Sequence, residues 1–355
     1  MIETLDDVRT AAATYGVPVF DATMIAMNAC GASSTHDLSR GRMQVRLPDN
    51  DETWQVILPL DADWAPFALE ADRIVIDREA TCEVVELEND DVVLTYLRAG
   101  GASLTLNTHS RSTCTGCLFC PNVIEDAADA TLRKEEELRE LLEWVVADNG
   151  WPDLSGVEVI TVCTGCFQTP AAAIQHMSAV QSAARAGGFR GRLHLLSSVI
   201  RDRADLEQIA AELLPFHLTL TVECFTRREL ILKQSKASLT MDDCCRILDD
   251  CAELGIDADF TYVVGLDPLD VTVAGLRRLA AHVTAFPRLQ VYQAHNEYMR
   301  RARTPEAASL EYFLEVRRSV ERSYADAEVA PKSWENYRPL WYTDFCGERV
   351  TGPRV

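Results

Sequence analysis

The sequence predicts an α/β protein that begins with a small β-rich domain and continues into a parallel sheet. Two observations indicate this fold class. Residues 42–108 hold short runs rich in Val, Ile, Leu and Thr, broken by Asp, Asn and Gly, which is typical of a small antiparallel sheet. From about residue 103, strand-like runs alternate with helical stretches. Such β/α repeats form parallel sheets with right-handed crossovers, either open or curled into a partial barrel.

The first part of the chain, residues 1–102, is predicted to be the β-rich domain. A short helix over residues 5–15 precedes the strand candidates. No catalytic group of residues stands out there, so we expect a packing or substrate-covering role. The strand candidates are residues 43–48, 53–60, 72–77, 82–89, 91–97 and 103–108.

The second part, residues 103–320, is predicted to hold six β/α repeats. Helical stretches at 132–150 and 241–255 lie between strand candidates. The second stretch starts after Thr240, with Asp243 three residues on, and stops at Gly255, which are ordinary signals of a helix start and end. The strand candidates are residues 103–107, 157–162, 192–198, 217–223, 257–265 and 288–295.

Composition narrows the classes of function. The 355 residues carry a net charge of −21, which argues against a nucleic-acid partner because phosphate contacts need clustered Lys and Arg. No signal peptide is visible, and no apolar run reaches the roughly 18 residues of a spanning helix. We therefore expect a cytoplasmic protein without a membrane partner. In a reducing cytosol, its 12 cysteines are expected to be thiols or metal ligands rather than disulfides.

The most informative stretch is HSRSTCTGCLFCPNVIE, residues 109–125. Cys114, Cys117 and Cys120 are spaced CxxCxxC, and the loop follows the first repeat strand. Sites on such sheets lie at the carboxyl ends of the strands. Structural zinc takes four protein ligands, whereas three thiolates can hold a [4Fe–4S] cluster and leave one iron open to an external ligand. The spacing thus favours a cluster completed by a substrate or cofactor.

These residues resemble the radical S-adenosylmethionine (SAM) superfamily, whose usual motif is CxxxCxxC with an aromatic residue before the last cysteine. Here Phe119 holds that aromatic position, while the first interval is one residue short. Thr164 and Gly165 match part of the family's glycine-rich turn. Residues 218–267 resemble its fourth and fifth strands, with Glu223 closing one of them. The resemblance covers roughly residues 103–320.

The resemblance implies a partial (β/α)6 barrel and two cofactors, a [4Fe–4S] cluster and S-adenosylmethionine. Cys114, Cys117 and Cys120 would be the metal ligands, and the open iron would bind the methionine part of SAM. Reduction by a donor such as flavodoxin or ferredoxin would release a 5′-deoxyadenosyl radical that abstracts a substrate hydrogen.

The resemblance also suggests which residues contact SAM. Phe119 and Gly265 would lie near the adenine, and the backbone of Thr164 and Gly165 would face the methionine ammonium. Other candidates end strands or follow them, where a carboxylate or hydroxyl suits the ribose or the ammonium and a cation suits the carboxylate. Plain turns and solvated helix charges remain alternatives. These candidates are Ser198, Glu223, Arg227 and Lys233.

Four further residues are candidates for catalysis. Cys163 and Cys166 could bind an auxiliary cluster with Cys346, donate a hydrogen atom or cycle through a disulfide, or they could simply be small residues at a crowded turn. His295 could bind substrate or move a proton, and a structural role is equally compatible. The aromatic segment 321–355, which carries Cys346, could close the open side of the barrel or dock as core.

The leading hypothesis is a radical SAM enzyme acting on a small molecule in natural-product or cofactor biosynthesis, with the reaction subtype open. The acidic composition and the absence of an obvious peptide- or tRNA-binding domain motivate the small substrate. The alternative is a zinc-stabilised binding or regulatory protein that uses Cys114 and Cys117 with Cys163 and Cys166. That alternative leaves Cys120 without a role.

Overall fold

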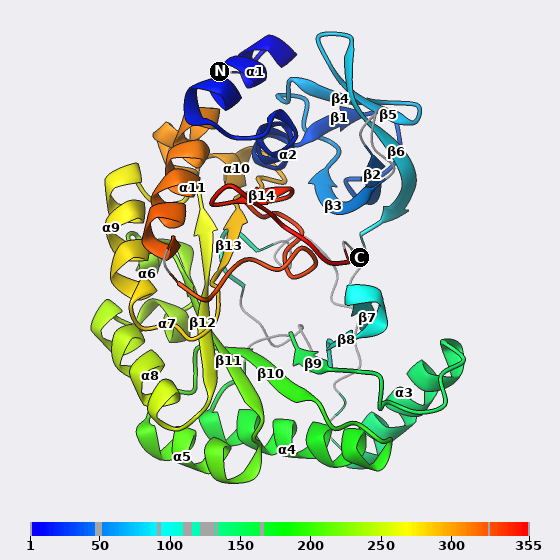
Figure 1. Ribbon diagram of the computed structural model, residues 1–355, viewed down its shortest axis with the longest axis vertical. Helices are drawn as coiled ribbons and strands as arrows, with labels where there is room; N and C mark the ends of the chain where they lie inside the picture. The colour runs from blue at the N-terminus through cyan, green and yellow to red at the C-terminus, as the bar shows by residue number, and fades with distance from the viewer. Residues whose placement is uncertain are drawn as a thin grey trace.

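The computed structural model describes residues 2–46, 52–90, 94–108, 116–120, 132, 134–163, 167–325 and 327–353. It contains a six-stranded sheet near the N-terminus, a seven-stranded sheet with helices along its outer face, and a two-stranded hairpin near the C-terminus. The two large sheets lie at opposite ends of the molecule, and the C-terminal segment runs between them (Figure 1). The predicted fold class is confirmed.

The N-terminal part contains two helices and a mainly antiparallel sheet. Its strand order is β1-β4-β5-β6-β2-β3, and only the β1–β4 pair is parallel. The elements are α1 (Leu5–Tyr15), α2 (Val19–Cys30), β1 (Ala32–Ser34), β2 (Arg40–Arg46), β3 (Thr53–Pro59), β4 (Phe67–Glu70), β5 (Arg73–Ile76) and β6 (Glu79–Asn89).

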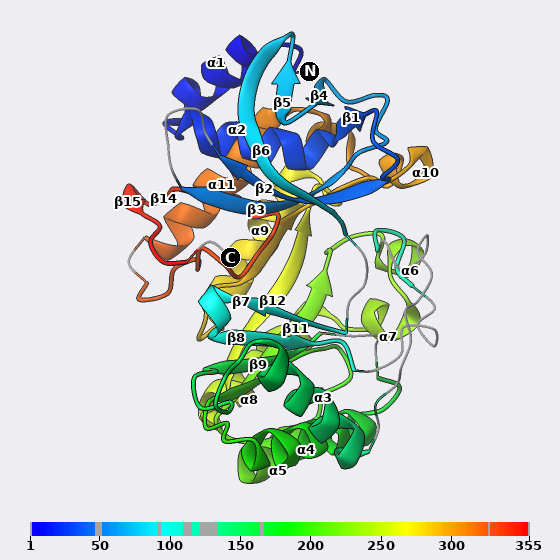
Figure 2. The same ribbon diagram turned by 90° about the vertical axis from the view of Figure 1, so that its right-hand side faces the viewer.

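The sequence predicted neither the short strands β1 and β4 nor helix α2. The helix is buried from Phe20 to Ala29, on all sides rather than along one stripe. A helix that is apolar all round is typical of a core position. It packs between α1, α11 (Leu310–Tyr324) and strand β3, at the centre of the upper half of the molecule (Figure 2).

The seven-stranded sheet is the expected partial barrel. Six parallel strands follow in chain order from β8 to β13, and β7 adds an antiparallel edge beside β8. Strand β7 falls within residues 1–102, yet it pairs with the barrel and not with the N-terminal sheet. The strands are β7 (Thr95–Arg98), β8 (Ser103–Leu106), β9 (Val159–Val162), β10 (Arg192–Ser197), β11 (Phe216–Glu223), β12 (Asp257–Val264) and β13 (Arg288–Val291).

Helices cover the outside of the barrel, as right-handed β/α crossovers require. The helix predicted at 241–255 begins at a capping box in which Thr240 and Asp243 exchange hydrogen bonds, and Gly255 follows its end in the left-handed conformation. This helix is α8 (Met241–Glu253). The other barrel helices are α3 (Glu135–Asp148), α4 (Pro170–Ala186), α5 (Arg203–Glu212), α6 (Arg228–Ile231), α7 (Gln234–Ala237), α9 (Leu269–Ala280) and α10 (Glu297–Arg300).

The segment after α11 bridges the two edges of the partial barrel. On one edge, Arg98 of β7 donates to the Glu335 carbonyl at 2.8 Å. On the other edge, the Val291 amide of β13 donates to the Arg338 carbonyl at 2.8 Å. The hairpin of β14 (Asp344–Phe345) and β15 (Glu348–Arg349) follows. This placement combines both expectations for the tail, since residues 332–338 cover the open side and later aromatic residues pack into the core.

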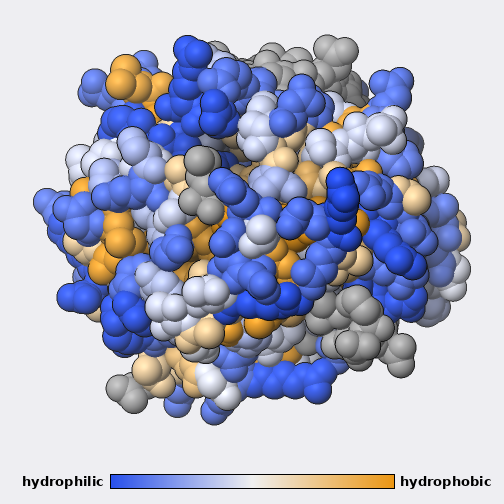
Figure 3. Space-filling model, turned by 90° about the horizontal axis from the view of Figure 1, so that it is seen from above, coloured by the Kyte–Doolittle hydropathy of each residue, from blue (hydrophilic) through white to orange (hydrophobic). Residues whose placement is uncertain are grey.

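No described helix is both long enough and apolar enough to cross a membrane. Seen from above, the atoms that are not grey form a mostly hydrophilic surface with small, separate hydrophobic patches (Figure 3).

Candidate functional site

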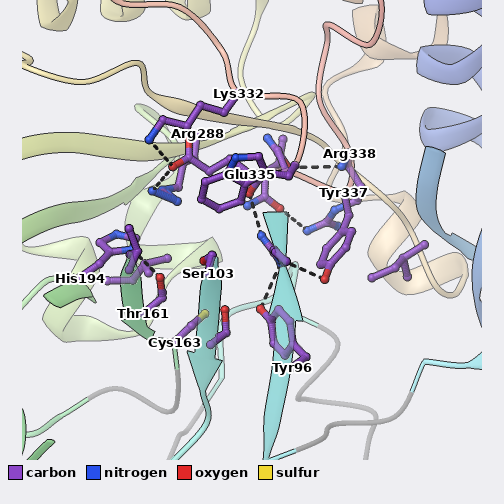
Figure 4. Close-up of a pocket in the computed structure, with 18 of the residues that line it drawn as sticks. Tyr96, Ser103, Thr161, Cys163, His194, Arg288, Lys332, Glu335, Tyr337 and Arg338 are labelled. Atoms are coloured by element: carbon purple, nitrogen blue, oxygen red, sulfur yellow. Dashed lines mark hydrogen bonds and ion pairs between the residues drawn. The ribbon is translucent and has the colours of Figure 1, made fainter. Parts of the chain in front are cut away.

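A cavity of about 260 Å³ occupies the concave side of the partial barrel. Its floor is made by side chains that point inward from the strands, and residues 332–338 of the tail form the opposite wall (Figure 4). Strands β2 and β3 of the N-terminal sheet close a third side. Residues that line the floor include Ser103, Thr105, Thr161, Cys163, His194 and Gln290.

The interior of the barrel is polar because alternate residues of its strands are polar. Hydrogen bonds join Thr161 to Nδ1 of His194 (3.0 Å) and Nε2 of His194 to Thr219 (2.8 Å). Burial lowers the pKa of His194 well below its usual value, so this imidazole is neutral and bridges the two hydroxyls. Thr219 donates in turn to Asp259.

Asp259 carries the buried negative charge of this interior. His217 Nε2 lies 3.2 Å from its Oδ2, and Arg288 Nε lies 3.6 Å from the same oxygen. Burial opposes ionisation, yet the nearby Arg288 and His217 prevail and hold the pKa of Asp259 below its usual value. Arg288 also pairs with Glu335 of the tail at 2.9 Å. The barrel floor and the tail are thereby joined by charge.

The cysteine turn lies at the carboxyl ends of the strands. Of the three predicted ligands, Cys117 and Cys120 belong to the described residues and Cys114 does not. The Cys120 amide donates to the Cys117 carbonyl (2.9 Å), and the Leu118 amide donates to the Ile231 carbonyl (2.8 Å). Cys117 is buried among apolar side chains, and Phe119 packs against the same cluster. That cluster includes Cys224, Ile231, Leu232, Val263, Leu266 and Tyr292.

Glu223 ends strand β11 beside this turn, in an uncommon conformation for a residue other than glycine (φ 69°). Lys236 Nζ lies 2.5 Å from its Oε1, and the Thr261 hydroxyl donates to its Oε2 at 3.0 Å. The ion pair is buried, with Glu223 6% and Lys236 8% exposed. The sequence offered Arg227 and Lys233 as cations for the carboxylate of SAM, whereas the cation that pairs with Glu223 itself is Lys236.

Three buried hydroxyl groups near this ion pair have no hydrogen-bond partner among the described residues. They belong to Ser198, Thr221 and Ser235. Arg201 connects two of them, because it donates both to the Ser198 carbonyl and to the Ser235 carbonyl. Buried polar groups rarely stay unpaired in a protein without a ligand or water to satisfy them. These groups suit a polar ligand at the carboxyl end of the barrel.

The other residues predicted to contact SAM do not take part in the Glu223–Lys236 ion pair. Arg227 donates to the backbone carbonyls of Leu266 and Ala302, so the structure gives it a role in holding loops. Lys233 precedes α7 and has no ion pair among the described residues. Gly265 follows β12 with φ 120°, where a Cβ would lie 3.1 Å from Tyr292 Cβ, so this close approach requires glycine. Thr164 and Gly165 lie outside the described residues.

Of the cysteines that the sequence offers as catalytic candidates, one lies at the cavity and another lies away from it. Cys163 lines the cavity at the end of β9, and Cys166 lies outside the described residues. Cys346 is exposed on the β14–β15 hairpin, where its thiol donates to the Glu321 carbonyl at 3.5 Å. Because that hairpin packs on α11, the structure does not bring Cys346 to the cavity.

His295 is buried at the end of the sixth barrel strand, and its Nε2 has no partner within the described structure. Burial, with Arg40 and Arg338 nearby, lowers the pKa of His295 to about 3. The imidazole is therefore neutral at physiological pH. It can offer a hydrogen bond without adding charge.

Acid should destabilise the protein through His295. In the unfolded chain this histidine has a pKa of about 6.5. Between pH 6.5 and pH 3 the unfolded state binds a proton at His295 and the folded state does not. The free energy of unfolding therefore stays at its full value above about pH 6.5 and falls as the pH drops toward 3. The expected loss is about 2 kcal/mol at pH 5 relative to pH 7. Urea unfolding of the wild type and the His295→Gln variant at both pH values measures it.

The exposed His36 provides the control for this measurement, because His36→Gln should leave the pH dependence as it is in the wild type. Equal pH dependence in the wild type and the His295→Gln variant would contradict the assignment.

Comparison with known proteins finds similar structures but no protein of similar sequence. A scan against protein-family models finds no match, and a search of curated proteins finds none either. The structural neighbours are radical SAM enzymes. One is the methyltransferase TsrM of Kitasatospora setae, solved with cobalamin and a [4Fe–4S] cluster (16% identity over 54% of this chain and 36% of that chain, TM-score 0.37).

Two others are SuiB of Streptococcus suis bound to S-adenosylmethionine and the cobalamin-dependent OxsB. SuiB shares 13% identity over 54% of this chain and 40% of that chain, with a TM-score of 0.38. OxsB shares 15% over 64% and 36%, with a TM-score of 0.33. This chain thus spans about two-fifths or less of the length of these enzymes. At such TM-scores they assign no role to a residue here.

Proposed function

We propose that this protein is a radical SAM enzyme that abstracts hydrogen from a small molecule held in the barrel cavity. The observation that carries the proposal is the place of the Cys117–Cys120 turn. It lies at the carboxyl ends of a parallel partial barrel, next to a buried Glu223–Lys236 pair. This is the end of a β/α sheet at which ligands bind.

The donor set fits an iron–sulfur cluster held by Cys114, Cys117 and Cys120. Thiolates are the ligands of such clusters, and hydrogen bonds and burial tune their potentials. Within the described ranges, no group of three His, Cys, Asp or Glu forms another metal site. The zinc alternative leaves Cys120 without a role, although Cys120 belongs to the same turn as Cys117.

The residues around the turn would hold SAM beside the cluster. We infer that the unpartnered hydroxyls of Ser198, Thr221 and Ser235 serve its ribose and methionine groups, and that the ion pair with Lys236 holds the Glu223 side chain in position. Lys233 would meet the carboxylate. Phe119 and Gly265 would border the adenine. With both cofactors bound, the site would supply a carbon radical strong enough to remove hydrogen from a substrate.

The cavity residues would then act on the substrate. Cys163 presents a thiol to the cavity, where it could return a hydrogen atom to a substrate radical. His295 does not line the cavity but lies near Arg40 and Arg338, which do, and its neutral imidazole would bind substrate or hold a proton at Nε2. A reductant such as flavodoxin or ferredoxin would deliver the electron.

Anaerobic purification and reconstitution test the proposal. We expect a brown protein with a broad absorbance band at about 400 nm, about four irons per chain, and 5′-deoxyadenosine after reduction with dithionite in the presence of SAM. The wild type reconstituted without sulfide serves as the control. A colourless protein with one bound zinc per chain would refute the radical SAM function.

A further inference from the structure

The cavity has the opposite charge from the protein as a whole. The chain carries a net charge of −21, yet seven basic side chains and two acidic ones are among the described residues that line the cavity. A cleft with one sign of charge concentrates ligands of the other sign. The question is which of these cations are already neutralised by the protein.

Most of the cavity cations have carboxylate partners. Arg40 and Arg42 both pair with Asp90. Arg192 pairs with Asp257 at 2.5 Å. On the tail side, Arg288 and Lys332 both contact Glu335, at 2.9 and 3.8 Å. These five charges are therefore at least partly balanced.

Arg98 is different, because none of its partners is a carboxylate in the described structure. It donates to the hydroxyls of Tyr337 (3.0 Å) and Tyr96 (3.1 Å) and to the Glu335 carbonyl (2.8 Å). Its guanidinium carbon lies 4.0 Å from the centre of the Tyr337 ring and 4.9 Å from that of Tyr96. The two tyrosines fix the position of the guanidinium but leave its charge unneutralised.

Arg338 is the second unneutralised cation. Its side chain donates to a neutral amide, Gln290 Oε1, at 2.6 Å, and no described carboxylate pairs with it. Burial and the neighbouring Arg40 lower the pKa of Arg338 to about 10, although Cys120, Asp90 and Glu223 oppose this shift. Arg338 is half-buried. A guanidinium partly withdrawn from water without an anion is costly, and a bound anion would relieve that cost. Arg338 and Tyr337 lie on the same wall of the cavity (Figure 4).

We propose that the substrate carries a carboxylate or phosphate group, which binds in the cavity to Arg98 of β7 and Arg338 of the tail. A guanidinium matches the geometry of both groups with paired hydrogen bonds. Tyr96 and Tyr337 would flank the ligand, and its uncharged part would extend toward Cys163 and the cysteine turn. That this ligand is the substrate rests on the proposed function. The anion site itself rests only on the cavity.

Three ligands of one shape test the site by calorimetry at constant ionic strength: benzoate, phenyl phosphate and uncharged benzamide. The wild type should bind at least one of the anions about tenfold more tightly than benzamide, because hydrogen bonds to charged groups are the stronger kind. The tighter anion identifies the carboxylate or the phosphate class. Equal affinity for benzamide, or no binding of either anion, would overturn the proposal.

Variants locate the site. Arg98→Gln and Arg338→Gln should each weaken anion binding about tenfold, whereas Arg338→Lys should retain part of it. Arg318→Gln is the matched control, because Arg318 is exposed on α11 and pairs with Glu315. Circular dichroism confirms that each variant folds. Unchanged anion affinity in both glutamine variants would show that the anion binds elsewhere.

The same variants separate the substrate anion from the carboxylate of SAM. In reconstituted protein, we expect Arg98→Gln and Arg338→Gln to retain iron and wild-type affinity for SAM. Loss of SAM affinity with retained benzoate and phenyl phosphate affinity would assign the guanidinium groups to the cofactor and overturn the proposal. The anion titrations are also done on the protein before reconstitution, without cluster or SAM. If reconstitution gives no iron, the proposed function fails while the anion site is still tested.

Discussion

Replacement of Cys117 or Cys120 by alanine is expected to abolish both iron binding and cleavage of SAM. The proposed ligand set consists of three thiolates, with Cys114 as the third, so the loss of one would remove a third of the cluster's protein ligands. Iron content after anaerobic reconstitution should fall from about four per chain to less than one. Release of 5′-deoxyadenosine, measured by chromatography, should fall below detection. Cys114→Ala should behave in the same way.

The control for these variants is Cys251→Ala. Cys251 is buried on α8 with apolar neighbours, and burial raises the pKa of its thiol to about 12, so it is a core residue rather than a ligand. Its loss should cost stability while iron content and SAM cleavage persist. Retention of both iron and cleavage in Cys117→Ala or Cys120→Ala would show that the ligand assignment is wrong.

The sequence predicted the barrel well because its elements have strong local signals. The strands are runs of β-branched and aliphatic residues, and helix α8 has a complete capping box at Thr240. Helix α2 was missed because it is buried on every side, including at polar residues such as Asp21, so it shows no apolar stripe of helical period. Its position depends on contacts with α11 and the tail, which are remote in sequence.

The polar floor of the cavity could have been found in the sequence. His217, Thr219, Thr221 and Glu223 alternate with apolar residues along one strand, and Asp257, Asp259 and Thr261 do so along the next. A period of two in strands buried on both faces indicates a polar interior. Of these residues, only Glu223 was predicted to belong to the site. The hydrogen-bond and ion-pair network around Asp259 became apparent only in the structure.

Other site residues could not be predicted from local patterns. The pairing of Lys236 with Glu223 depends on how α6 and α7 fold back over β11. Arg98 and Arg338 are 240 positions apart, and only the tail that crosses between β7 and β13 brings them to one cavity. Pairings of this kind arise from tertiary structure and leave no periodic signal.

A buried ion pair holds that tail in place. Asp21 of α2 is 0% exposed, and Arg317 of α11 is 1% exposed, with Arg317 Nη1 2.6 Å from Asp21 Oδ2. The Asp21 carboxylate also accepts hydrogen bonds from the Tyr342 amide (3.1 Å) and from the amide and hydroxyl of Thr343 (3.0 and 2.6 Å). Arg317 donates to the Leu340 carbonyl at 2.8 Å. One pair of charges therefore joins two helices to the segment that closes the cavity.

Asp21→Asn is expected to lower the free energy of unfolding by about 3–5 kcal/mol, because it leaves Arg317 buried without its closest carboxylate. The amide group would also present a donor to backbone amides that need an acceptor. Urea unfolding measures this loss.

The matched control is Asp6→Asn, which breaks the exposed pair with Arg9 (2.8 Å) and should cost less than about 1 kcal/mol. Since the tail carries Arg338, Asp21→Asn should also weaken binding of anions to the cavity under conditions where the variant is folded. A loss no larger than that of the control would show that the buried pair does not anchor the tail.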